Sequence, residues 1–394
     1  MAHQALEGVK VADFSWILAG PLSTKYLADH GATVIKIESA QAPDMTRTMA
    51  PYRDGIPGLN RAGLAAIVNT SKLSLSLDLN HPRFPEMLAR LIEWADIALE
   101  GFAPGQAARW GLTYENLTKI KPDIIMLSTS MQGQTGPHAQ QPGFGFLVNS
   151  LAGFTDLTGW PDREPAGLAI PYTDVVAPWF ETVALLAALD YRRRTGQGQY
   201  IDVSQLEAGL SFLRVPLLDC AANGRVQERR GNRSPCAAPH GVYRCRGDDR
   251  WCAIAVFTRE QWHAFCEVLG RPAWCRKPAF ATLTARLKHQ DDLDRLVEGW
   301  TRERAAEEVA ALMQAHGIPA GVVQNARDIM ERDPQVEHRG WARKLSHPEL
   351  GEYRDMGSPA QLTRTPAQPR PAPCLGEHTG YVCTHLLGMS DAEF

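Results

Sequence analysis

The chain has 394 residues, and its 41 Lys and Arg against 44 Asp and Glu leave a formal net charge of −3. Such a length predicts two or three domains, and the near-neutral charge argues against a general nucleic-acid-binding protein. The composition, 44% hydrophobic and 22% charged, is typical of a globular protein, and no run approaches the ~20 apolar residues of a membrane span.

The first half of the chain alternates short apolar runs with helical patterns. Pro21 suits the first turn of a helix, Gly31 suits its end, and Thr113 suits an N-cap. Strands are expected at 9–14, 32–37, 73–79, 97–99 and 123–128, with helices at 21–27, 82–94 and 113–120. Strands separated by helices need crossover connections, so this order predicts a mostly parallel sheet.

The pattern changes in the second half. Long helices are predicted at 174–194, which Gly196 ends, and at 202–217, followed by a charged linker at 225–233. Residues 242–256 predict a hairpin that turns at 246–249, and Thr258 with Gln261 predicts a capping box at the start of a helix. Helices then continue to about 316, a strand follows at 318–323, and 359–373 is Pro-rich and extended.

These elements predict an α/β fold with two domains. The large α/β domain covers 1–210 and is completed by 330–394, and a smaller α+β domain covers 225–325. The segments 211–224 and 326–340 are expected to be linkers.

The spacing of the cysteines and the absence of several known motifs exclude several classes of enzyme. None of the eight cysteines forms a C-x-x-C pair, and no P-loop, H-E-x-x-H or G-x-S-x-G motif is present. The first residues lack the basic and apolar regions of a secretory signal, so we expect a cytoplasmic protein with reduced thiols and no metal site.

Five segments carry a resemblance that runs through nearly the whole chain. They are LEGVKVADFSWILAGPLSTKYLADHGATVIKIES (6–39), NTSKLSLSLDLNHP (69–82), GFAPGQAARWGLTYENL (101–117), YTDVVAPWFETVALLAALDYRRRTGQGQYIDVSQLEA (172–208) and CLGEHT (374–379). In this order they resemble the class III coenzyme A transferase family, the CaiB/BaiF type, which includes formyl-coenzyme A transferases and α-methylacyl-coenzyme A racemases.

The resemblance implies a fold, substrates and partners. It implies a Rossmann-like large domain with a mostly parallel sheet, a smaller α+β domain and a dimer of two interlocked chains. Acyl-coenzyme A and a carboxylic acid are the expected substrates, and no tightly bound cofactor is expected. The expected partner is a second copy of the chain, or a sister subunit in a hetero-oligomer; no nucleic-acid or membrane partner is expected.

The resemblance also assigns a nucleophile, Asp174 in the sequence PYTDVVAP. A carboxylate can attack a thioester carbonyl to form a mixed anhydride, and the released thiolate can then form an aspartyl–coenzyme A thioester. By local sequence alone, Asp174 also fits an ordinary residue at the start of a helix.

Further residues match ligand-binding positions of the family. Ile17, Leu18 and Ala19 match the loop near the thioester, where an apolar Leu18 replaces the Gln of some relatives. Arg109 matches an arginine that binds phosphate, for which a guanidinium is well suited. The positions that match the nucleotide-binding residues are Ser39, where some relatives have Arg, and Leu77, Gly101 and Phe102.

Gly143 and Phe144 distinguish two activities within the family. Racemases have a Gly-His-Asp sequence here, whose His is one of two proton-transferring bases, whereas this chain has Gly143-Phe144-Gly145. Phenylalanine cannot accept a proton, which favours coenzyme A transfer. The resemblance implies a succinyl-type donor, because dicarboxylates are frequent donors among relatives. The alternatives are an acyl-coenzyme A racemase or isomerase, and a coenzyme A-binding subunit of a hetero-oligomeric transferase.

Some relatives have a poly-glycine loop, which is absent from 220–275 of this chain. The arginines of the 225–233 linker could bind a dicarboxylate substrate, and they also fit a solvated surface.

Overall fold

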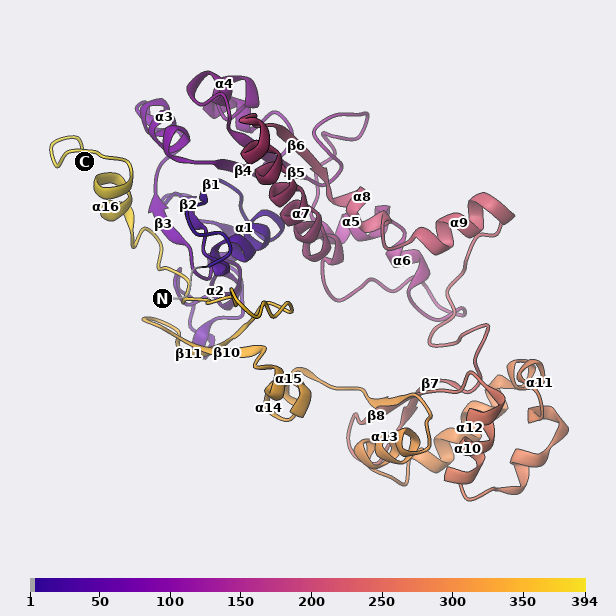
Figure 1. Ribbon diagram of the computed structural model, residues 1–394. Helices are drawn as coiled ribbons and strands as arrows, with labels where there is room; N and C mark the ends of the chain where they lie inside the picture. Colours follow the sequence, from indigo (N-terminus) through magenta and orange to yellow (C-terminus); the bar gives the residue numbers. More distant parts are fainter. Residues whose placement is uncertain (1–3) are drawn as a thin grey trace. The chain divides into compact units, whose positions relative to one another are not determined.

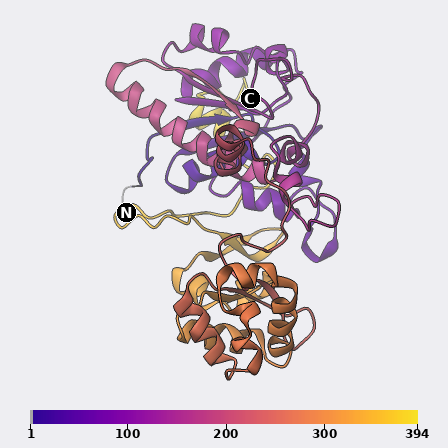
Figure 2. The same cartoon turned by 90° about the vertical axis from the view of Figure 1, so that its right-hand side faces the viewer.

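A computed structural model describes residues 4–394, which form two units (Figures 1 and 2). The first unit contains the chain up to Thr155, Gly167–Gln227 and Glu337–Phe394. The second contains Asp156–Ala166 and Glu228–Val336. The short segment Asp156–Ala166 therefore leaves the first unit, although its sequence gave no sign of this.

A six-stranded parallel sheet forms the centre of the first unit (Figure 1). Its strands are β1 (Lys10–Asp13), β2 (Thr33–Glu38), β3 (Leu73–Ser76), β4 (Ile97–Glu100), β5 (Ile125–Ser130) and β6 (Tyr200–Ser204). They lie in the order β3-β2-β1-β4-β5-β6, so the order reverses between β1 and β4. This confirms the predicted Rossmann-like α/β class.

Helices cover both faces of this sheet because successive side chains of each strand point to opposite sides. Val11 and Val34 pack with α1 (Ala19–Asp29) and α7 (Tyr172–Thr195) on one face. Ala12 and Ile35 pack on the other face with α3 (Phe84–Trp94), α4 (Tyr114–Ile120) and the π-helical turn Val382–Leu386 that follows α16 (Thr379–Tyr381).

Helix α7 is the one described helix that is long and apolar enough to span a membrane. Half of its most apolar stretch is buried inside the structure, and the core helix of a soluble protein can have the same length and composition.

The helix predicted at 202–217 is wrong. Its first residues belong to β6, because Tyr200–Ser204 pairs with Met126–Ser130 of β5. Ser204 then caps a short helix, α8 (Gln205–Leu210), by accepting a hydrogen bond from the amide of Glu207. The chain continues as α9 (Arg214–Asn223), which occupies the segment expected to be a linker.

Smaller elements complete the first unit. They are α2 (Gly63–Val68), α5 (Gly145–Leu151), the first half of α6 (Phe154–Leu157), within which the chain passes to the second unit, and an antiparallel hairpin of β10 (Ala342–His347) and β11 (Gly351–Met356).

The second unit has an antiparallel sheet of β7 (His240–Arg244), β8 (Trp251–Ala255) and β9 (Ala320–Val322). Its helices are α10 (Arg259–Val268), α11 (Leu283–Lys288), α12 (Gln290–Thr301), α13 (Ala306–Ala315) and α14 (Ala326–Glu331), and the chain returns to the first unit within α15 (Pro334–Arg339). The predicted hairpin is present, and so is the capping box of Thr258 and Gln261. Helices α14 and α15 occupy most of 326–340, which we expected to be a linker.

Candidate active site

The carboxyl ends of β1 and β4 lie side by side where the strand order reverses. Doubly wound sheets bind their ligands in the crevice outside such a switch point. The loops after these two strands carry four of the predicted site residues, Ile17, Leu18, Gly101 and Phe102, and a fifth, Ala19, begins α1 directly after the first loop. The rings of Trp16 and Phe102 are in edge contact with centroids 5.9 Å apart, so the two loops adjoin.

Two more predicted residues lie at the same edge of the sheet. Leu77 follows β3, and its amide donates to the carbonyl oxygen of Glu38 at 2.7 Å. Ser39 follows β2 and is buried; its hydroxyl accepts a hydrogen bond from the amide of Gln41 at 3.2 Å. The hydroxyl of Ser39 is thus engaged in its own turn.

Arg109 lies beside a separate hollow of the first unit. It belongs to the 3-10 turn Ala107–Trp110, and it lines an open cavity of about 540 Å³ together with Leu79 and Trp110. Its exposed guanidinium donates to the side-chain oxygen of Gln106 at 3.1 Å. This exposure leaves donors of the guanidinium accessible to an anionic group from solvent.

Asp174 is the third residue of α7, and its carboxyl group lies against the backbone of Gly145 at the start of α5. A Cβ atom at position 145 would lie 2.3 Å from Oδ2 of Asp174, so no side chain fits there beside the present carboxylate. Burial raises the pKa of Asp174 to about 6, although the amino end of a helix favours negative charge. A carboxylate that its surroundings solvate poorly is a stronger nucleophile than one in water.

A buried asparagine ties the start of α7 to α5. Asn149 accepts a hydrogen bond from the amide of Thr173 at 3.2 Å and donates to the carbonyl oxygen of Ile170 at 2.9 Å. Pro178, four residues after Asp174, has no amide hydrogen for the carbonyl of Asp174. The hydrogen bonds of Asn149 therefore help to fix the turn that carries Asp174, where the helix lacks one of its own hydrogen bonds.

A second acidic residue, Glu181, lies two helical turns beyond Asp174 and is fully buried. Thr129 of β5 donates a hydrogen bond of 2.7 Å to its carboxyl group. Burial raises the pKa of Glu181 to about 7, and the charge of Asp174 adds to this rise. Below this pH Glu181 is mostly protonated and adds no negative charge near Asp174. The roles of Glu181, Asn149 and Gly145 were not predicted from the sequence, in which an acidic residue within an Ala- and Leu-rich helix is the signal that Glu181 offers.

Buried ion pairs lie beneath the loop after β1. Asp13, the last residue of β1, binds Lys72 at 3.0 Å, and Lys36 of β2 binds Asp44 at 3.0 Å. Burial alone would raise the pKa of Asp13, but Lys72 and Lys36 hold it below its ordinary value. Burial lowers the pKa of Lys72 to about 8.

Gly143 and Phe144 lead into α5. The ring of Phe144 is 61% exposed, and the residue stands immediately before Gly145. Neither side chain can accept a proton, so this segment provides no base next to Asp174.

Three of the four arginines of the 225–233 segment have acidic partners. Arg225 binds Asp219 at 2.8 Å, Arg229 binds Asp156 at 2.9 Å, and Arg233 binds Asp291 and Asp294. These pairs are local to each unit and satisfy the guanidinium groups in part.

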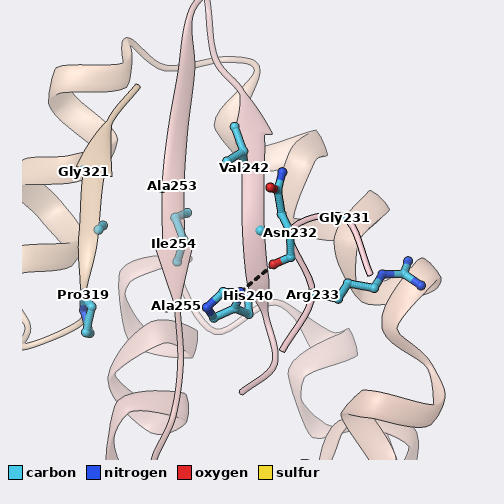
Figure 3. Close-up of a pocket in the computed structure, with 12 residues that line it drawn as sticks. Gly231, Asn232, Arg233, His240, Val242, Ala253, Ile254, Ala255, Pro319 and Gly321 are labelled. Carbon is cyan, nitrogen blue, oxygen red and sulfur yellow. Dashed lines mark hydrogen bonds between the residues drawn. The ribbon is translucent and has the colours of Figure 1, made fainter. Parts of the chain in front are cut away.

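The second unit has a cavity of its own, of about 510 Å³, on its antiparallel sheet (Figure 3). Small residues such as Ala253 and Gly321 line it, and His240 bonds the carbonyl oxygen of Asn232 at 2.6 Å. None of the predicted site residues lines this cavity.

The comparisons with known proteins agree on one family. The family model described as CoA-transferase family III matches residues 6–379. A succinyl-CoA–D-citramalate CoA-transferase of Chloroflexus aurantiacus is 32% identical over 98% of this chain and 95% of its own length. A succinate–glutarate CoA-transferase of Agrobacterium fabrum is 31% identical over 97% of this chain and 95% of its own length. The crystal structure of a CAIB/BAIF family protein from Brucella suis has a TM-score of 0.89 and 30% identity, covering 98% of this chain and 100% of that one. The chain therefore belongs to CoA-transferase family III, as its five sequence segments predicted, and is a class III coenzyme A transferase.

Proposed function

We propose that the enzyme moves coenzyme A from an acyl-coenzyme A donor to a carboxylic acid through covalent intermediates on Asp174. The observation that carries this proposal is the carboxylate of Asp174. It has a raised pKa, and the last turn of its helix lies near the starts of β4 and β5, where Arg192 binds Asp96 and Asp123, so that α7 begins towards the carboxyl edge of the sheet.

The proposed route has four steps that balance without an oxidant or reductant. The carboxylate of Asp174 attacks the thioester carbonyl, the carbon–sulfur bond breaks, and a mixed anhydride forms with free coenzyme A thiolate. The thiolate then attacks the aspartyl carbonyl, which releases the donor's acid and leaves an aspartyl–coenzyme A thioester. The acceptor carboxylate repeats these steps in reverse order. The route needs no cofactor besides the coenzyme A of the substrates.

We propose succinyl-coenzyme A as the donor and a dicarboxylic acid as the acceptor. The names of two relatives support this choice, because one combines succinyl-coenzyme A with D-citramalate and the other combines succinate with glutarate. The racemase alternative has less support, since Phe144 replaces its second base. The alternative of a non-catalytic subunit has less support because the acidic group at position 174 is retained.

The proposal is tested by incubating the purified protein with succinyl-coenzyme A and a panel of carboxylic acids. Mass spectrometry should detect a new acyl-coenzyme A, with citramalate and glutarate among the best acceptors and free succinate released in equal amount. Monocarboxylic and aromatic acids serve as the comparison set. Exchange of the Cα hydrogen of a chiral acyl-coenzyme A without any transfer would identify a racemase instead.

The rate of transfer should fall in acid because Asp174 must be ionised to attack. Its pKa of about 6 places the loss of kcat/KM below that pH, whereas an ordinary aspartate would remain active to about pH 4. A pH profile of coenzyme A release measures this. Glu181→Gln enzyme is the control, since Glu181 has a pKa of about 7. An inflection near 6 that disappears in this variant would assign the titration to Glu181 and contradict the prediction.

We further propose that the enzyme is a homodimer. Helix α9 buries none of its side chains, and its Val215 and Leu218 are 73% and 68% exposed. Val183 of α7 is 67% exposed. Exposed apolar side chains of this size favour a protein interface. Sedimentation at micromolar concentration should give twice the mass of one chain, and a monomer would contradict the proposal.

A further inference from the structure

Ile17, in the loop at the switch point, adopts a left-handed backbone conformation with φ of 69°. This conformation is uncommon for any residue other than glycine, and it is a strained outlier for a β-branched side chain such as isoleucine. Surrounding contacts must therefore hold the residue in place.

Those contacts come from Asp44. The amide of Ile17 donates to both carboxylate oxygens of Asp44, at 3.1 Å each. Asp44 itself is fully buried and also accepts hydrogen bonds from the amide and the hydroxyl of Thr46, at 3.0 and 3.1 Å. Its carboxylate is thus fixed by the segment that follows β2.

Lys36 completes the arrangement from the neighbouring strand. Its ammonium group binds Asp44 at 3.0 Å and also donates to the carbonyl oxygen of Ser15. Burial alone would raise the pKa of Asp44, but Lys36 and the amides of Thr46 and Ile17 keep it below its ordinary value. The buried Lys36–Asp44 ion pair therefore forms hydrogen bonds with two backbone groups of the loop, the carbonyl of Ser15 and the amide of Ile17.

We propose that Asp44, paired with Lys36, is a positioning residue for coenzyme A transfer. It holds Ile17 in its strained conformation and thereby shapes the Trp16–Leu18 loop at the switch point, the position at which doubly wound sheets bind their ligands and at which we place the acyl-coenzyme A. This inference rests on the proposed function. Asp44 does not touch the reacting atoms; it acts through the backbone of Ile17.

A rescue experiment separates this role from ordinary stabilisation. Asp44→Asn removes the charge that holds Ile17, and we expect kcat/KM to fall at least about tenfold, as for a displaced substrate-binding group. Glycine adopts positive φ without strain, so adding Ile17→Gly should recover most of the lost kcat/KM while the thermal stability stays low. A double variant that remains as impaired as Asp44→Asn would overturn the proposal.

A second pair of variants leaves the ion pair intact, in case Asp44→Asn does not fold. Ile17→Pro cannot adopt positive φ and has no amide hydrogen for Asp44, whereas Ile17→Val keeps both the amide and the branching. We expect Ile17→Pro to lose far more affinity for coenzyme A and for succinyl-coenzyme A in calorimetry than Ile17→Val does. Equal affinities of the two variants would overturn the proposal.

The control is a matched buried acid away from the loop. Asp29, the last residue of α1, is buried, binds Lys25 at 2.6 Å and accepts hydrogen bonds from Thr70 and Ser71, so Asp29→Asn should lower the melting temperature without changing the KM for succinyl-coenzyme A. Calorimetry of the wild type separates the two proposals. Wild type that binds neither coenzyme A nor succinyl-coenzyme A would refute the proposed function, whereas wild-type binding that Ile17→Pro leaves unchanged would refute the positioning role alone.

Discussion

Asp174→Asn enzyme is expected to lose coenzyme A transfer, with kcat lower by about 10³-fold or more, because an amide cannot form the anhydride. The side chain keeps its size, so the site should still bind acyl-coenzyme A. Steady-state kinetics with succinyl-coenzyme A and calorimetry of coenzyme A binding measure the two properties separately.

The folding stability of Asp174→Asn should rise, although its activity falls. The pKa of Asp174 is raised in the folded state, so the unfolded chain binds fewer protons between pH 4 and 6 and folding stability falls as pH rises through this range. At neutral pH, removing the charge should stabilise the protein by at most about 3 kcal/mol, since one pKa unit corresponds to about 1.4 kcal/mol.

Asp190→Asn is the matched control on the same helix. Asp190 is exposed and forms an ion pair with Arg194 one turn further on. This variant should retain normal kcat and nearly normal stability, because exposed pairs contribute little. An Asp174→Asn enzyme with near-normal turnover would reject the nucleophile.

Gly145→Ala is expected to lower kcat by about 10²-fold, because even a small displacement of a reacting group, here the carboxylate of Asp174, can lower the rate this much. The new Cβ would lie within 2.3–2.6 Å of all three carboxyl atoms of Asp174, so the carboxylate must rotate away. The KM for the acyl-coenzyme A should change little, because position 145 contacts Asp174 and not the loops at the switch point.

Folding should tolerate this substitution. Gly145 has no positive φ and begins a helix, where alanine is a favourable residue. Gly299→Ala in α12 is the control, because a Cβ there meets nothing within 4 Å. Circular dichroism and melting temperatures check both proteins. Full activity of Gly145→Ala would show that the carboxylate does not need its present position.

The sequence predicted the local elements well and the long-range contacts poorly. The strand and helix alternation up to Ser128 required only apolar periodicity and helix caps, such as Thr113, which accepts from the amide of Asn116. The helix predicted at 202–217 was wrong because β6 is a strand only through its pairing with β5. The β10–β11 hairpin escaped prediction because its strands, ARKLSH and GEYRDM, are mostly polar and exposed.

The same division holds for the site. The position of Asp174 in the first turn of a long helix followed from its sequence neighbours. Its apposition to Gly145, 29 residues earlier, depends on how α5 packs against α7. The contact of Ile17 with Asp44 spans 27 residues and needs β2 between them. No pattern in a single sequence indicates which of these distant residues lie close in space, so the roles of Asp44, Asn149 and Glu181 could be found only from the structure.

Trapping of the covalent intermediate tests the central claim most directly. Wild-type enzyme is incubated with succinyl-coenzyme A without an acceptor, treated with hydroxylamine, digested and analysed by mass spectrometry. Attack of hydroxylamine on an aspartyl thioester or anhydride leaves a hydroxamate. We expect this modification on Asp174, and only when the donor is present. A hydroxamate on Glu181 or on another acid, or unmodified peptides from an enzyme that transfers coenzyme A normally, would contradict it.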